Sequence, residues 1–223
     1  MCLWTVPINR NTTGTEEGVT PEHRHFFETK FSPGLFYGFG HKKDIKELFN
    51  AFPSVRENHT DKTSALDVGF GSTSELYTLA EINPVNRLVG IDVYARRMKS
   101  IARELKDFPS ISAMQGDINN LVFENDYFNF VYAFNVLYLA DNLTSFCAEV
   151  CRILKRKGWF LLMNNIRAGK TGARIAGQLA RAKITVHENT ETEIITALNS
   201  AGFKAVQHAC TSRETFILSA QKK

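Results

Sequence analysis

The sequence has little of what marks several protein classes. Only 4 of its 223 residues are cysteine, and they are too scattered for a disulfide framework. No run approaches the roughly 20 apolar residues that a membrane span needs. The first residues, Met-Cys-Leu-Trp-Thr, lack the basic start and apolar run of a signal peptide. We therefore expect a soluble cytoplasmic protein with no membrane partner.

The apolar content is high enough for a folded core. Hydrophobic residues make up 43% of the chain and aromatic residues 11%, which excludes disorder over its whole length. The net charge of +4 is concentrated late in the chain, where nine basic side chains and no acidic one lie between Cys151 and His187. Such a segment could attract an anionic partner, and the alternative is a solvated helix and loop.

The first 58 residues differ in pattern from the rest. Residues 1–20 are polar and rich in threonine, which is typical of a mobile arm. Apolar residues at helical spacing then predict a helix over 42–52, ended by Pro53. We divide the chain into an N-terminal arm and helical lid, 1–58, and a main domain, 59–223.

The main domain alternates between strand-like and helical segments. Strands are expected at 64–68, 87–92, 110–116, 128–137 and 158–164, and helices at 74–82, 94–105, 143–154 and 190–201. This alternation predicts an α/β fold with a mainly parallel sheet. Two final strands, 203–210 and 215–221, are close enough in sequence to form an antiparallel hairpin.

Three acidic residues lie at the carboxyl ends of three consecutive predicted strands. Asp67 begins a glycine-rich turn with Gly69 and Gly71, where the backbone can approach a ligand closely. Asp92 follows 21 residues after Gly71 and could accept both hydroxyls of a ribose, and Asp117 could accept the amine of an adenine. Because the carboxyl ends of parallel strands meet in one crevice, these residues predict an adenosine-type ligand.

The same segments resemble the class I S-adenosylmethionine-dependent methyltransferases, in their small-molecule branch (methyltransferase type 11, quinone-biosynthesis-like). The resemblance covers about residues 60–221 and rests on five segments: Asp67–Ser72, Gly90–Val93, Gly116–Ile118, Phe130–Tyr138 and Arg152–Gly158. It implies a Rossmann-like three-layer sandwich with a seven-stranded, mainly parallel sheet. It also implies S-adenosyl-L-methionine as cofactor and methyl transfer to a small-molecule acceptor by in-line displacement, in which the protein mainly aligns the reactants.

The resemblance also implies a set of cofactor-binding residues: Tyr37, His41, Asp67, Gly69, Phe70, Gly71, Ser72, Asp92, Val93, Asp117, Ile118 and Asn135. In this interpretation the backbone of the glycine turn passes under the methionine part, and Asp67 contacts the amino-acid moiety. Core packing is the alternative for Val93 and Ile118. A hydrophobic entry into the 42–52 helix is the alternative for the Tyr37–His41 segment.

The sequence departs from the family pattern at two places. Thr73 stands where a third glycine is common, and Tyr138-Leu139 replaces a His-His pair at the end of the fourth strand. The second change argues against a histidine-assisted deprotonation there. It leaves Tyr138 as the candidate for substrate contact or proton relay, or as an aromatic residue that packs at the sheet edge.

The acceptor is less well defined than the cofactor. A basic stripe after the fifth strand favours a carboxylated or phosphorylated acceptor, through Arg167, Lys170, Arg174 and Arg181. The Asp/Asn-Pro-Pro-Tyr/Phe motif of base methylases is missing, so a nucleic acid is disfavoured, although an RNA methyltransferase stays an alternative. An NAD-dependent Rossmann oxidoreductase would need a glycine where Ser74 stands, and a binding-only scaffold would not need the three acids. No cysteine or histidine spacing completes a metal site, and the sequence does not predict an oligomeric state.

Overall fold

The computed structural model describes residues 41–58, 62–93, 95–165, 177, 187, 189–211 and 215–223. Tyr37 and the basic stripe that begins at Arg167 lie outside these ranges, so their predicted roles stay predictions. His41 is the first residue of a helix, and the description there covers its backbone alone.

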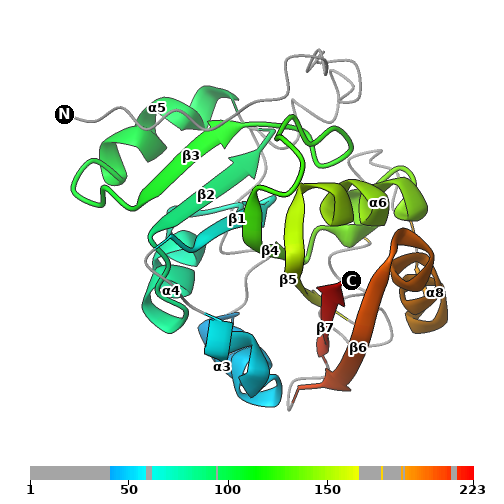
Figure 1. Cartoon of the computed structure of the whole chain (residues 1–223). Coiled ribbons are helices and arrows are strands. Elements are labelled where there is room, and N and C mark those ends of the chain that lie inside the picture. The colour runs from blue at the N-terminus through cyan, green and yellow to red at the C-terminus, as the bar shows by residue number, and fades with distance from the viewer. Residues whose placement is uncertain are drawn as a thin grey trace.

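The strands of the described residues form a seven-stranded sheet in the order β3-β2-β1-β4-β5-β7-β6 (Figure 1). The first five strands are mutually parallel, whereas β7 pairs antiparallel with both β5 and β6. The predicted α/β fold, with its mainly parallel sheet and antiparallel C-terminal hairpin, is therefore confirmed. The strand bounds are β1 Ser64–Val68, β2 Arg87–Asp92, β3 Ile111–Gln115, β4 Phe128–Phe134, β5 Leu154–Asn165, β6 Phe203–Cys210 and β7 Thr215–Lys222.

Helices cover both faces of the sheet and make it the middle of three layers (Figure 1). Helices α3, α4 and α5 cover one face of the sheet, and α6 and α8 cover the other. Their bounds are α3 His41–Ala51, α4 Thr73–Ile82, α5 Ala95–Glu104, α6 Leu143–Ile153 and α8 Glu191–Ala201, with short 3-10 helices η1 Pro53–Asn58 and η2 Leu137–Leu139. In α8 Thr190 and Glu193 form a capping box, and Gly202 ends the helix with φ of 101°.

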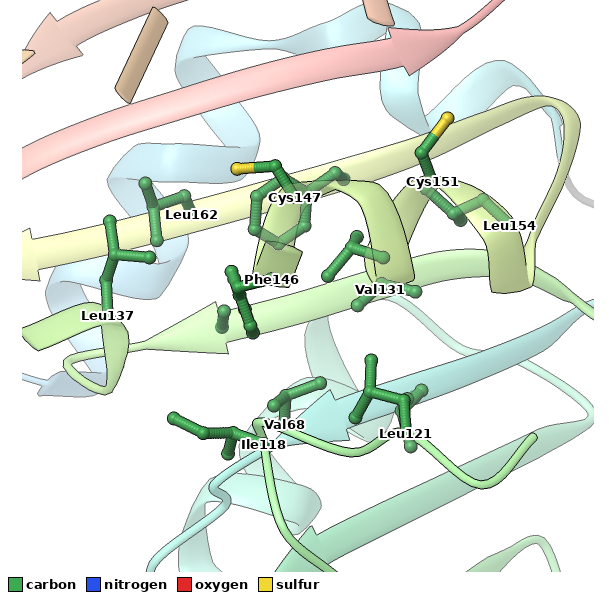
Figure 2. Close-up of a cluster of buried hydrophobic side chains, with 14 of the residues drawn as sticks. Val68, Ile118, Leu121, Val131, Leu137, Phe146, Cys147, Cys151, Leu154 and Leu162 are labelled. Atoms are coloured by element: carbon green, nitrogen blue, oxygen red, sulfur yellow. The ribbon is translucent and has the colours of Figure 1, made fainter. Parts of the chain in front are cut away.

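Each face of the sheet has its own hydrophobic cluster. Beneath α3 and α4, Phe49 packs edge-on against Tyr132 of β4, so the helix predicted over 42–52 is part of the core. Figure 2 shows part of the opposite cluster, in which Phe146 and Cys147 of α6 lie over Val131 and Leu162 of the sheet. Both cysteines of α6 are buried there, as expected of a packed helix face. A domain boundary at residue 58 stays a prediction.

The two largest differences between predicted and observed strand lengths, in the fourth and fifth strands, have local backbone reasons. The fourth strand ends at Phe134 because Asn135 adopts a left-handed conformation with φ of 54°, after which η2 begins. The fifth strand begins at Leu154, four residues before the predicted start, because Leu154 pairs with Phe128 before the register shifts. Within the described ranges, no helix is long and apolar enough to cross a membrane.

Candidate cofactor site

The glycine-rich turn between β1 and α4 is anchored to the neighbouring strand. The backbone N–H groups of Gly69 and Phe70 both donate to the Ile91 carbonyl of β2, at 2.8 and 3.2 Å. Gly69 and Gly71 adopt φ of 75° and 58°, a region that non-glycine residues enter at a cost. The turn thus has a left-handed backbone at both glycines.

Gly69 also lies against the end of β4. A Cβ atom on Gly69 would come within 2.7 Å of Val136 Cγ1, which is closer than any real contact. Only a residue without a side chain fits this space. The close approach brings the glycine turn next to the segment that starts at Asn135, so the ends of β1 and β4 form one continuous edge.

Asp92, the last residue of β2, is tied directly to the turn. Its side chain is 6% exposed, and Oδ2 accepts a hydrogen bond of 2.9 Å from the Gly71 N–H. The structure therefore brings Asp92, the predicted ribose contact, next to the glycine turn that is predicted to lie under the methionine part. This bond also fixes the orientation of the Asp92 carboxylate relative to the turn.

The Phe70 side chain does not face the site. It is fully buried beneath α4, and a Cβ atom on Gly90 would come within 2.7 Å of the Phe70 ring. Gly90 of β2 therefore makes room for Phe70, and any cofactor contact from Phe70 would come from its backbone. The sequence interpretation named Gly90 as part of a motif and did not foresee this packing.

Ser72 and Thr73 begin helix α4. Ser72 is its N-cap in extended conformation, and its hydroxyl shares a hydrogen bond of 2.7 Å with the Ser74 hydroxyl. Thr73, at the position where the family often has glycine, donates to Glu104 Oε2 of α5 at 2.5 Å. The threonine thus links the turn to α5.

The loop after β3 holds the predicted adenine contacts. Asp117 is half-buried, and its Oδ1 accepts the Asn119 N–H at 2.8 Å, so one carboxylate oxygen stabilises its own loop. Ile118 is 7% exposed and lies in the cluster that includes Val68 and Leu121 (Figure 2). Val93, at the end of β2, is half-buried. The core-packing alternative thus accounts for most of the Ile118 side chain.

Asn135 and Tyr138 lie at the end of β4. Asn135 donates its N–H to the Met163 carbonyl at 2.7 Å, which fixes it beside β5. Tyr138 is half-buried in η2, and its carbonyl accepts the His187 N–H at 2.9 Å. Burial raises the pKa of the Tyr138 hydroxyl above its ordinary value, which favours a hydrogen-bond donor over a base at neutral pH.

One residue of the site was missed by the sequence interpretation. Glu75, in the first turn of α4, is 1% exposed, and Asp67 is fully buried. Burial, with a smaller contribution from the Asp92 charge, raises the pKa of Glu75 well above its ordinary value, although its interaction with Asp67 opposes the shift. The only signal in the sequence was an acidic residue at the start of the helix, next to the apolar Leu76. The structure shows that its neighbours Thr73 and Leu76 are buried as well.

These features fit S-adenosylmethionine. The turn offers a left-handed glycine backbone, and the space at Gly69 is one that a Cβ would fill. Asp92 presents a carboxylate at the end of β2, next to that backbone. Asp67 and Asp92 lie in the last residues of β1 and β2, and Asp117 follows β3. Because these adjacent strands are parallel, the three acids lie at the same end of the sheet.

Comparisons with known proteins agree with this geometry. Residues 66–162 match a family model described as a methyltransferase domain (type 11). No curated protein matches the sequence. Solved structures show the same fold at low identity. One is a chain in the complex between the Haloferax volcanii Trm112 methyltransferase activator and a methyltransferase described as putative. It is 17% identical, with a TM-score of 0.65, over 86% of this chain and 98% of that one.

Two other structures extend the likeness. A SAM-dependent methyltransferase from Aquifex aeolicus is 15% identical over 87% of this chain and 100% of that one, with a TM-score of 0.62. The CurJ carbon methyltransferase is 16% identical over 89% of this chain and 59% of that one, with a TM-score of 0.67. The family match over the glycine turn and the ends of β1, β2 and β4 shows that residues 66–162 resemble a methyltransferase domain, and these solved structures show that the chain has the fold of S-adenosylmethionine-dependent methyltransferases.

Proposed function

We propose that this enzyme transfers the methyl group of S-adenosylmethionine to a small-molecule acceptor by in-line displacement, in the cytoplasm. The observation that carries the cofactor half of the proposal is the bond between Gly71 N–H and Asp92 Oδ2, which joins the glycine turn to the end of β2. A small acceptor is supported by the type 11 family match and by the likeness to a carbon methyltransferase domain of the citrinin polyketide synthase.

The residues of the chain would bind and orient rather than react. When bound, S-adenosylmethionine supplies a methyl group already activated on a sulfonium. The glycine turn would lie under its methionine part, Asp92 would accept the ribose hydroxyls, and Asp117 the adenine amine. Alignment alone can contribute about 7–11 kcal/mol to a reaction of two bound partners. A site without an evident base is therefore consistent with this chemistry.

A label-transfer experiment tests the acceptor class. The protein is incubated with methyl-labelled S-adenosylmethionine and, separately, with a small-molecule extract, total RNA and total protein. We expect label in the small-molecule fraction. Label in RNA alone would contradict the proposal and support the nucleic-acid alternative. An anionic acceptor predicts that the labelled product is retained by an anion-exchange resin.

Removing the Asp92 carboxylate should weaken cofactor binding. Because Oδ2 holds the turn while the carboxylate faces the predicted ribose site, Asp92→Ala loses both contacts, whereas Asp92→Asn keeps a side-chain oxygen for the Gly71 N–H. We expect the dissociation constant to rise at least tenfold for Asp92→Ala, about 1.4 kcal/mol, and less for Asp92→Asn. Calorimetric titration with S-adenosylmethionine measures both, with Asp107→Ala as the exposed acidic control.

Tyr138 should act through its hydroxyl as a donor. Because the pKa of Tyr138 is raised, its hydroxyl stays protonated from pH 6 to 9. Tyr138→Phe is expected to raise the KM for the acceptor severalfold and to leave the shape of the pH profile of kcat unchanged. Loss of a basic limb from that profile in the variant would instead assign Tyr138 as a proton relay.

A further inference from the structure

Basic side chains gather at the end of the sheet opposite the cofactor site. The starts of β5 and β6 and the end of β7 meet there, because β7 runs antiparallel to both neighbours. Two of the basic residues, Lys155 and Lys222, are half-buried, and the loop before β4 adds the exposed acids Glu124 and Asp126. The four exposed cations form what we call the basic row: Arg156, Lys157, Lys204 and Lys223.

The first two residues of the basic row lie in a turn within β5. Residues 155–158 stand opposite Asn129 of β4, where the register between the two strands shifts. Lys155 Nζ donates to Asn129 Oδ1 at 3.1 Å. On the other side, Gln221 Nε2 of β7 donates to the Lys157 carbonyl at 3.1 Å. Both neighbouring strands therefore hold this turn in place.

Lys157 has a backbone conformation that favours glycine. Its φ is 60°, in the left-handed region where a Cβ atom is disfavoured. The Lys157 side chain is exposed, so packing does not explain why a lysine stands at this position. Residues in such conformations often serve a ligand, and the neighbouring Arg156 presents a second exposed cation beside it.

The kind of partner follows from what accompanies the cations. Phe108 is the only large hydrophobic side chain that is exposed among the described residues, and it lies just before β3, at the other edge of the sheet. Protein interfaces take most of their energy from aromatic and other large anchors, which the basic row does not offer. Phosphate contacts need cations alone. Because neighbouring strands are about 4.8 Å apart, the three strand ends set the cations in a line, which matches a strand of phosphates better than a planar bilayer surface.

We propose that the basic row binds the phosphate backbone of a nucleic acid without reading its sequence. Lys222 supports the row from below, since its Nζ donates to the Leu154 carbonyl at 2.7 Å and to Asp126 Oδ1 at 2.8 Å. The row lies at the opposite end of the strands from Asp92, so it is a docking surface and the nucleic acid is not the methyl acceptor. The inference goes beyond the proposed function and does not depend on the cofactor site.

The salt dependence of binding tests this surface. The probe is a fluorescein-labelled RNA duplex of about 20 base pairs, and fluorescence anisotropy with the full chain gives the dissociation constant. Each neutralised phosphate contributes about 0.7–0.9 to the slope of log affinity against log salt. Four contacts therefore predict that affinity falls about 50–150-fold between 50 and 200 mM salt. A duplex of unrelated sequence should bind within about twofold, because phosphate contacts carry no sequence information.

Lys157→Gly separates binding from folding. Glycine relieves the left-handed backbone, so this variant should unfold at a higher urea concentration than the wild type. It also removes one cation, so it should bind the duplex at least threefold more weakly at 50 mM salt and lower the slope by about 1. Arg156→Gln combined with Lys157→Gln should lower the slope by about 2. Lys43→Gln, a change at an exposed cation of α3, is the control and should leave affinity within about twofold.

Three results would overturn the proposal. One is a Lys157→Gly variant that gains stability and binds the duplex as tightly as the wild type, since the lysine would then serve no ligand. Another is an equal loss of affinity in Lys43→Gln, because the attraction would then come from the net charge of the whole chain. The third is weak binding of the duplex beside strong sedimentation with phosphatidylcholine vesicles that contain about 30% phosphatidylserine, which would assign the row to a membrane surface. No arm contains S-adenosylmethionine, so the outcome is independent of the proposed methyl transfer.

Discussion

Replacing Gly69 with alanine is expected to destabilise the protein by about 2–5 kcal/mol and to abolish measurable cofactor binding. Two costs add at this position. An L-residue at φ of 75° costs roughly 1–2 kcal/mol, and forcing a methyl group to 2.7 Å from Val136 Cγ1 adds about 1–3 kcal/mol of overpacking. Urea unfolding measures the loss of stability, and calorimetric titration with S-adenosylmethionine measures the loss of cofactor binding.

A double-mutant cycle separates the two costs. Val136→Ala removes the methyl group that the new Cβ would meet, but it leaves the backbone angle of residue 69 unchanged. The double variant should therefore be about 1–3 kcal/mol more stable than the sum of the single changes predicts. Strict additivity would mean that the turn moves away from β4, and the close approach of the two segments would not be a constraint on the site.

Periodicity in the sequence predicted the elements of this fold well, because it reports local burial. The helix over 42–52 and the two C-terminal strands were recognisable from the spacing of their apolar residues. The contacts that shape the turn were not recognisable in this way. Gly69 meets Val136, and Phe70 meets Gly90, across strands that are distant in sequence. Nothing in the local pattern specifies which side chain a neighbouring strand presents.

The residues of the candidate site also divide into those that the sequence predicted and those whose place depends on tertiary packing. Asp67, Asp92 and Asp117 could be placed from sequence because each lies at the carboxyl end of a predicted strand, and parallel strands bring these ends together. Glu75 was missed because an acidic residue in the first turn of a helix is ordinarily a solvent-exposed partner of the helix dipole. Its burial depends on how α4 lies over β1, which is a property of the tertiary packing.

Replacing Arg152 of α6 with alanine is expected to cost about 2–4 kcal/mol of stability and to weaken cofactor binding about tenfold. The guanidinium donates to the carbonyls of Leu121 and Phe123, both at 2.7 Å, and to Asn125 Oδ1 at 2.8 Å. These bonds hold the loop that leads on from Asp117. Without them two partly buried carbonyl groups lose their donors, at about 1–3 kcal/mol for a fully buried group. Urea unfolding and calorimetric titration measure the two effects.

Two further variants show whether the loop or the ion pair carries this effect. Arg152 also forms a two-pronged pair with Glu149, through bonds of 2.9 and 2.8 Å. Because this pair lies at a partly exposed surface, Glu149→Gln should cost less than about 1 kcal/mol. Arg152→Lys keeps the charge, but a single ammonium cannot reproduce the planar fork that spans both carbonyls, so it should behave more like alanine than like arginine. If Glu149→Gln were instead as damaging as Arg152→Ala, the ion pair and not the loop would be the source of the stability, and cofactor affinity should then be unaffected by either change.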